Sequence, residues 1–594
     1  MLSLYFHRFW GLQTVAISYA NIYFLNFSSG DFPVRLKQIV YFVNLHLIIL
    51  FEKSKIGNVR KIFTILAVNL AFLAAAQTEL VFVYFKDKPN KSVFYNNPLS
   101  ELSQKSLDRR NRLDIALTDQ DAPIESTYIQ NVKNLGFTVK DYSKWLNGVA
   151  VNATASQINQ LSQLAYVDHV ESFVRNPDGG KRSKKIDKFK TLSGNPLIKD
   201  VMTDFNYGNS LSQINQINLR ALHVAGYTGT GMSIAVIDTG FPSVNTGSAF
   251  KRMRDNGHIK ATYNFVSKTS NVYSNSLDSH GAMCLGIIGG YIDGTFVGSA
   301  PDADFYLYAS EDAANEIPEE QLYWIEAAEE ADRQGVDVIS TSLGYSEFDD
   351  SRYDYTYDDM DGTTTFISRG AQVASEKGIF VLVAAGNEGQ DAWHYISAPA
   401  DNAKVFSIGA VTSSGNSSVF SSYGPNSAGV IKPDASARGT NTYYVYNNSS
   451  NYGNGTSFAT PLAAGGVACL LQSFAPSESR EYIKNRLKEN ASLYPNQSSQ
   501  MGYGILNFYK TYQTYLRLNE VAQSKIRIYP NPAKDFIIIS SDEKLQSAAI
   551  YDNLGRLIKM ENSDKLDISG LVKGSYLIQI KTKSGETIQK LIKE

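Results

Sequence analysis

Gly455-Thr456-Ser457-Phe458-Ala459-Thr460-Pro461 begins a run of small and apolar residues that continues through Leu471. A run of this kind predicts a buried helix whose first turn carries Ser457. The first turn of a helix has unpaired N–H groups and the positive end of the helix dipole, so it stabilises negative charge. Ser457 is therefore a candidate nucleophile, although Gly-Thr-Ser is also an ordinary helix cap.

Two upstream stretches carry the groups that such a serine needs. A β-branched run from Ser233 ends in Asp238-Thr239-Gly240, which predicts a buried strand with a carboxylate at its C-terminal edge, where open α/β sheets bind ligands. His280, one of only seven histidines, begins another small apolar helix. A lone histidine in such a place more often has a structural role. The order Asp238, His280, Ser457, with each residue in its own motif, favours a catalytic triad.

In these motifs the chain resembles the subtilisin-like serine peptidases, the subtilases, whose triad runs Asp, His, Ser along the sequence. The resemblance spans about 208–509 and includes Val383–Gly389 and Ser340–Gly344, which is similar to the substrate-aligning strand of the family. It implies an α/β catalytic domain with three layers around a parallel sheet. It also implies a secreted serine endopeptidase that needs no metal or organic cofactor for its chemistry.

The resemblance assigns a role to each site residue. Ser457 is the nucleophile, His280 the general base, Asp238 its orienting carboxylate, and Asn387 the oxyanion-binding side chain. The pocket for the side chain before the scissile bond is assigned to two backbone segments and a floor residue, namely Ser342, Leu343, Gly344, Ala384, Ala385, Gly386 and Ser397. Because the residues that line this pocket are small, we expect the pocket to prefer large uncharged side chains of the substrate.

Two departures from the family and two rival functions remain. Ala282-Met283 follows His280-Gly281 where many members have Thr-His, and Ala437-Arg438-Gly439 stands where Ala-Pro-Gly is common, but neither change removes a catalytic group.

A peptide ligase would use the same triad and differ in how well its acyl-enzyme excludes water. An inactive surface-binding protein would be expected to have lost one of the four groups, and none is missing.

Composition limits the other classes of function. A chain of 594 residues predicts three or four domains of about 100–200 residues each. The net charge of −2 gives no reason to expect a nucleic-acid partner. Only two cysteines are present, which excludes a disulfide framework. Cys284 and Cys469 fall in the helices after His280 and Ser457, and we expect both to be buried free thiols.

The N-terminal region has the parts of a secretory signal peptide in an unusual place. Residues 59–76 contain Val59-Arg60-Lys61, an apolar run and Ala74-Ala75-Ala76, which are the basic, apolar and small-residue parts of such a signal. A signal peptide belongs at a chain start. We therefore interpret residues 1–58 as a mis-assigned extension, with initiation nearer Val59. A membrane-anchored leader is the alternative.

Residues 77–175 predict a small α+β domain in the order β-α-β-β-α-β. It resembles the inhibitor-type propeptides that precede subtilase domains, which makes it an expected intramolecular inhibitor; an accessory binding domain is the alternative. Residues 176–206 follow, with the basic, glycine-rich run Gly179–Lys185. Because such a run cannot bury itself, it predicts a solvated linker that is suited to cleavage during processing.

The catalytic domain, 207–509, alternates predicted strands with helices, which indicates a parallel sheet. We expect strands over 297–308, 336–342 and 379–384, and helices over 319–335 and 364–377. The stretch 347–361 interrupts this pattern with clustered carboxylates that could hold a structural calcium ion, such as Asp349, Asp350, Asp358, Asp359 and Asp361. A solvated acidic loop is the preferred interpretation.

After a polar connection over 510–523, residues 524–594 show short alternating strands and turns, which predict a small all-β sandwich. Tyr529-Pro530-Asn531-Pro532 and the C-terminal lysine-rich end resemble the C-terminal sorting domains of the type IX secretion system of Bacteroidetes. The resemblance implies a secreted or cell-surface protein, exported through the periplasm by that machinery. A carbohydrate- or surface-binding module is the alternative.

Overall fold

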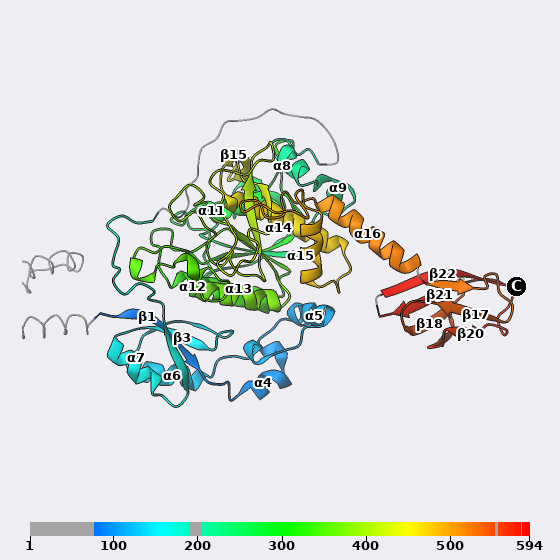
Figure 1. Ribbon diagram of the computed structural model, residues 1–594, viewed down its shortest axis with the longest axis horizontal. Helices are drawn as coiled ribbons and strands as arrows, with labels where there is room; N and C mark the ends of the chain where they lie inside the picture. Colours follow the sequence, from blue (N-terminus) through cyan, green and yellow to red (C-terminus); the bar gives the residue numbers. More distant parts are fainter. Residues whose placement is uncertain (1–76, 187, 189–204, 525, 553–555, 584) are drawn as a thin grey trace, which may run out of the picture. The chain divides into compact units, whose positions relative to one another are not determined.

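The computed structural model describes residues 77–186, 188, 205–524, 526–552, 556–583 and 585–594 (Figure 1). The predicted N-terminal extension (1–58) and signal peptide (59–76) lie outside these residues, and so does the segment 189–204. Within the described part of the chain, no helix has the length and apolarity that a bilayer span requires.

The catalytic domain is built on a seven-stranded sheet in the order β13-β12-β11-β10-β5-β9-β6, in which every neighbouring pair is parallel. Its strands are β5 (Ser233–Asp238), β6 (Ile259–Asn264), β9 (Asp304–Ala309), β10 (Val338–Thr341), β11 (Phe380–Ala384), β12 (Phe406–Val411) and β13 (Ala435–Arg438). The predicted α/β class with a parallel sheet is confirmed.

Helices cover both faces of the sheet, because successive side chains of a strand point to opposite faces. From β5, Ile234 and Val236 pack with α11 (His280–Gly289) and α14 (Thr456–Ser473), whereas Ala235 and Ile237 pack with α12 (Glu320–Gln334) and α13 (Phe366–Glu376). Figure 1 shows α12 and α13 side by side. The three-layer prediction is therefore confirmed.

Shorter elements complete this domain. They are α8 (Leu211–Gln216), α9 (Arg220–Val224), α10 (Lys251–Asp255), α15 (Arg480–Glu489), β7 (Tyr291–Ile292), β8 (Phe296–Val297), β14 (Thr442–Tyr446) and β15 (Ser449–Gly453). The single strand predicted over 297–308 is wrong, since β8 and β9 are separate. Ser299 and Ala300 donate their N–H groups to the carbonyls of Ile287 and Ile288 in α11, at 3.0 and 2.7 Å, and so leave the strand.

The N-terminal domain has an antiparallel sheet in the order β2-β3-β1-β4. Its elements are β1 (Glu79–Phe85), α6 (Ser126–Asn134), β2 (Val139–Ser143), β3 (Gly148–Ala153), α7 (Ala155–Ser162) and β4 (Val167–Ser172), which confirms the β-α-β-β-α-β order. Between β1 and α6 lies an arm that the sequence analysis missed. This arm contains α4 (Lys91–Asn96) and α5 (Gln104–Leu113).

The segment after β4 is less solvated than predicted. Exposed side chains do occur at Ser183, Lys184 and Lys185, but the Lys188 side chain is buried, with 5% exposure. The N–H of Arg182 donates to the carbonyl of Asp349 at 2.7 Å, and Lys188 is surrounded by carboxylates of the catalytic domain. The prediction of a fully solvated linker is wrong here, because acidic partners distant in sequence neutralise its charges.

The C-terminal domain forms two antiparallel sheets, β16-β17-β20 and β19-β18-β21-β22, around its own apolar core. The strands are β16 (Arg527–Tyr529), β17 (Phe536–Ser540), β18 (Leu545–Tyr551), β19 (Leu557–Glu561), β20 (Lys565–Asp567), β21 (Gly574–Thr582) and β22 (Gly585–Lys593). The predicted polar connection before it is instead helical, α16 (Phe508–Ser524). The Tyr515 ring stacks on Phe474 at 3.8 Å between centroids, so catalytic packing extends beyond the predicted boundary at 509.

Candidate active site

The predicted catalytic groups gather at one edge of the parallel sheet. Asp238 is the last residue of β5, Ser342 directly follows β10, and Ala385 directly follows β11. These strands are neighbours or next neighbours in the sheet, and the carboxyl ends of parallel strands share an edge. The edge therefore places a carboxylate, a backbone segment and the Asn387 loop together.

Asp238 and His280 form a buried pair. His280 is the first residue of α11, and its Nδ1 lies 2.8 Å from Oδ1 of Asp238. The carboxylate is fully buried and also accepts from the N–H of Thr239 at 2.8 Å. Burial favours the neutral imidazole, but the contacts with the Asp238 carboxylate and with Cys284 together outweigh burial and raise the pKa of His280 well above its usual value.

Ser457 lies in the first turn of α14, as predicted, and is held from two sides through its backbone. Its carbonyl accepts from Oγ of Ser342 at 2.8 Å and from Sγ of Cys284 at 3.4 Å. The same thiol lies 3.8 Å from Nδ1 of His280, so one side chain touches both the serine and the histidine segments. A Cβ at Gly455 would lie 2.7 Å from Oγ of Ser457, and only glycine leaves room for the hydroxyl there.

Asn387 is fixed beside the start of α14. Its Oδ1 accepts from the N–H of Thr456 at 2.8 Å and from Oγ1 of Thr456 at 3.0 Å. Because the amide oxygen is occupied, its NH₂ group is the part that remains for a ligand. Thr456 directly precedes Ser457, so this contact sets the amide next to the candidate nucleophile.

The predicted pocket residues also converge. The N–H of Ser397 donates to the carbonyl of Ala385 at 3.4 Å, and a side chain at Gly344 would clash with Oγ of Ser397. Ser342, Leu343, Ala384, Ala385 and Ser397 are buried, whereas Gly344 is exposed. These contacts bring together the segments that carry Ser342–Gly344, Ala384–Gly386 and Ser397.

The carboxylates predicted as calcium ligands in 347–361 are not gathered into one group. Asp350 binds Arg352 at 2.8 Å, Asp359 accepts from Thr356, and Asp361 accepts from Thr363 and Thr364. In the described residues, the groups whose ligand atoms approach one another closely enough for a metal lie elsewhere, at Asp238-His280-Cys284 and at Glu311-Glu316-Glu320. The calcium alternative for this loop therefore lacks a gathered ligand set.

Two contributors to the site were not predicted from the sequence. Thr456 holds the Asn387 amide, and Cys284 touches His280 and Ser457. The position of Cys284 one helical turn after His280 was a usable signal, because residues four apart lie on the same helix face. Cys284 and Cys469 are both buried free thiols, as predicted, and burial raises the pKa of each.

Known proteins match three parts of the chain. The family described as "Subtilase family" matches residues 229–504, "Peptidase S8 propeptide domain, Bacteroidota" matches 80–188, and "Secretion system C-terminal sorting domain" matches 527–594. The matches cover all three domains and agree with their predicted order. The third match identifies the β-sandwich as the sorting domain of an exported protein.

Individual relatives agree with the first match. Subtilisin NAT of Bacillus subtilis subsp. natto and subtilisin E of Bacillus subtilis (strain 168) are each 31% identical over 330 residues, which cover 54% of this chain and 76% of the relative. The crystal structure of the epidermin leader peptide processing serine protease from Staphylococcus aureus is similar with a TM-score of 0.49 and 18% identity, over 74% of this chain and 98% of that one. The family matches and the two subtilisins, with the Asp238–His280 pair and the segment of Ser457 at one sheet edge, show that the chain belongs to the subtilase family and is a secreted or cell-surface serine endopeptidase with an N-terminal propeptide domain and a C-terminal sorting domain.

Proposed function

We propose that Ser457, His280, Asp238 and Asn387 hydrolyse peptide bonds by acyl transfer to water. The Ser457 hydroxyl attacks the peptide carbonyl while Nε2 of His280 takes its proton. Nδ1 faces Asp238, so the ring keeps one orientation and its positive charge is stabilised. The single observation that supports this scheme most is the 2.8 Å contact between His280 and the buried Asp238 carboxylate.

The later steps reuse the same groups. The Asn387 amide and the N–H of Ser457 would bind the tetrahedral oxyanion at the N-terminus of α14. His280 then returns the proton to the leaving amine, and a water molecule activated by His280 releases the acyl group from Ser457. No step in this scheme requires a metal or an organic cofactor.

A serine-directed fluorophosphonate tests this assignment directly. The secreted, processed protein should react at one serine, and peptide mapping should place the label on Ser457. The matched control is Ser342, a second serine hydroxyl at the same edge that donates to the Ser457 carbonyl and has no role as nucleophile. A label on any serine other than Ser457 would contradict the proposal.

Removal of the Asn387 amide should slow the reaction without abolishing it. In Asn387→Ala, we expect kcat to fall by about 10²–10³, because one oxyanion donor is lost while the triad remains. Steady-state kinetics on a peptide substrate measure this loss. Asn402→Ala is the matched amide control for specificity, since Asn402 binds the carbonyls of Gly362 and Ser368 away from the triad. An unchanged kcat in Asn387→Ala would remove Asn387 from the scheme.

The same geometry supports a pocket for the side chain before the scissile bond, bounded by Ser342–Gly344 and Ala384–Gly386 with Ser397 as its floor. Its walls carry no charged side chain, so large uncharged residues should be preferred in substrate proteins or peptides. Cleavage of a peptide library reports this preference, and selection of acidic or basic residues at that position would reject the pocket.

We also propose that the propeptide domain acts as an intramolecular inhibitor, and that the type IX machinery exports the chain by its sorting domain. The propeptide packs on α12 and α13, where Glu329 of α12 accepts from Oγ of Ser143 at 2.6 Å and from the N–H of Trp145 at 3.0 Å. Apolar side chains of β1, such as Leu80 and Phe82, join the same buried cluster as these helices. The domain thus covers the face of the enzyme that α12 and α13 form.

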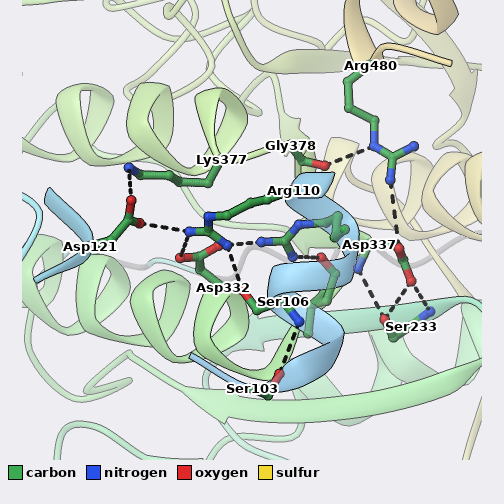
Figure 2. A network of polar contacts seen from close by, with 12 residues as sticks. Ser103, Ser106, Arg110, Asp121, Ser233, Asp332, Asp337, Lys377, Gly378 and Arg480 are labelled. Atoms are coloured by element: carbon green, nitrogen blue, oxygen red, sulfur yellow. Dashed lines mark hydrogen bonds and ion pairs between the residues drawn. The ribbon is translucent and has the colours of Figure 1, made fainter. Parts of the chain in front are cut away.

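The arm gives the propeptide a second attachment (Figure 2). Arg109 and Arg110 of α5 are both buried, and both bind the carboxylate of Asp332 on α12. Arg110 also binds Asp121 of the propeptide at 2.8 Å, and Asp121 binds Lys377 of the catalytic domain at 3.1 Å. Positive and negative charges therefore alternate along a chain of ion pairs that joins the two domains and gives each buried ion a partner.

A further inference from the structure

Three buried carboxylates form a second acidic group near the triad. Glu311 follows β9, Glu316 lies in the next loop, and Glu320 begins α12, with exposures of 4%, 6% and 0%. One oxygen from each lies within 4.8 Å of the others. The ammonium of Lys188 sits among them, at 3.2 Å from Glu311, 3.5 Å from Glu316 and 2.5 Å from Glu320.

Two of these carboxylates are held in place by the catalytic domain itself. Glu320 accepts from the N–H groups of Asp312 and Ile317 at 2.7 and 3.1 Å, and Glu311 accepts from the hydroxyl of Tyr345. Glu316 differs, because its contact is with Lys188, and its Oε1 has no hydrogen-bond partner within the described part of the chain. The three carboxylates are therefore a preformed cluster in which one acceptor atom, Oε1 of Glu316, is still open.

The cluster adjoins the active site. Ser310, the residue before Glu311, donates its N–H to the carbonyl of Asp238 at 2.9 Å. Tyr345, which binds Glu311, directly follows the segment Ser342–Gly344. The acidic cluster thus lies at the same sheet edge as the triad carboxylate, on the β9 side, whereas Ala384–Gly386 follows β11 on the other side of β10.

Within the range expected for processing, we place the cut after Lys188, which removes the present occupant. The propeptide match ends at Lys188. Burial raises the pKa of Glu316 to about 8, which reflects the cost of negative charge in this cluster. Burial also opposes a charge on Lys188, but the three carboxylates outweigh it and raise the pKa of that ammonium. Once Lys188 leaves, the three carboxylates remain as oxygen acceptors, and a new cationic group among them would again lower the pKa of Glu316, as Lys188 does.

We propose that the cluster of Glu311, Glu316 and Glu320 is a subsite for a lysine side chain of the substrate, separate from the pocket before the scissile bond. The inference rests on the proposed function of the triad. An ammonium has three N–H donors, which match three carboxylates, whereas the larger planar guanidinium of arginine fits this compact group less well. Calcium binds six to eight oxygen ligands, whereas three monodentate carboxylates supply three. The cluster therefore fits an ammonium better than a calcium ion.

Paired peptides test the subsite on the processed wild-type enzyme. Each pair keeps the best residue before the scissile bond and carries either lysine or norleucine at one other position, scanned along the peptide. At one position, kcat/KM should favour lysine over norleucine by at least about tenfold, as expected for charge-assisted hydrogen bonds. Arginine there should be cleaved more slowly than lysine.

Glu316→Gln is the decisive variant, because it keeps the side-chain shape and Glu316 receives no backbone donor. It should abolish the lysine preference and leave cleavage of the norleucine peptide unchanged. Glu376→Gln, which removes an equal charge from an exposed position on α13, should keep the preference. Preference that persists in Glu316→Gln, or equal cleavage of both peptides by the wild type, would overturn the inference.

Two further outcomes separate the possible failures. If CaCl₂ raises the melting temperature of wild type but not of Glu316→Gln, and no lysine preference exists, the cluster is a metal site and the inference is wrong. If neither peptide is cleaved and Ser457 takes no fluorophosphonate label, the proposed triad itself has failed, and the subsite fails with it.

Discussion

Ser457→Ala should lower turnover by about 10⁶, because the members of a triad act as a unit and a residual rate comes from binding and the oxyanion site alone. His280→Ala should cost a similar factor. Both variants should also accumulate as uncut precursor, whereas the active wild-type enzyme should begin between Pro177 and Tyr207. Kinetics on a fluorogenic peptide and N-terminal sequencing measure the two effects.

The control for this prediction is a second serine of α14, which is not the proposed nucleophile. Ser473→Ala, at the other end of α14, should process and turn over normally, since its hydroxyl binds only the nearby carbonyl of Leu470. Wild-type hydrolysis by purified Ser457→Ala would remove Ser457 from the mechanism. An active form that starts near Gln77 would contradict the propeptide assignment.

Arg110→Ala should detach the propeptide arm. Arg110 is 1% exposed and binds both Asp332 and Asp121, so its removal leaves two fully buried carboxylates short of a partner. Breaking one side of a buried ion network costs about 3–5 kcal/mol. In a Ser457→Ala background, which keeps the chain uncut, hydrogen-exchange protection of α5 should fall by a factor between about 10² and 10⁴.

Arg112→Ala is the matched control on the same helix. Its side chain is 42% exposed and lies 4.0 Å from Asp337. The free energy that stabilises α5 should therefore fall by less than about 1 kcal/mol, as for other exposed pairs. Protection of α6, outside the arm, should change little in either variant. Equal exchange of α5 in Arg110→Ala and in the unmodified background would show that the buried network does not hold the arm.

The motifs at strand ends and helix starts made the catalytic domain predictable. Asp238 ends an apolar β-branched run and Ser457 begins a helix of small residues, so local patterns placed these two groups at element ends, whereas the role of Asn387 came from the resemblance to the family. The strands and helices of the propeptide and C-terminal domains were equally predictable from their periodicity, and the roles of these domains came from resemblance.

Features that depend on distant partners were not predictable. Helix α5 has the sequence of a solvated polar segment. Two of its three arginines, Arg109 and Arg110, are buried because they bind Asp332, which lies more than two hundred residues later in the chain. Lys188 looked like part of a solvated run for the same reason, since its three carboxylates belong to another domain. Ser299 and Ala300 left their predicted strand to bind α11, a competition that no local pattern reveals.

Because ion pairs join α5 to α12 and Lys377, cleavage of the chain does not by itself release the propeptide. A cut after the propeptide severs one peptide bond and leaves Arg109, Arg110 and Asp121 bound to Asp332 and Lys377. We therefore expect a nicked but silent enzyme whose onset of activity is timed by escape or destruction of the arm. For an exported protease, such a delay would protect the export route from the enzyme that travels through it.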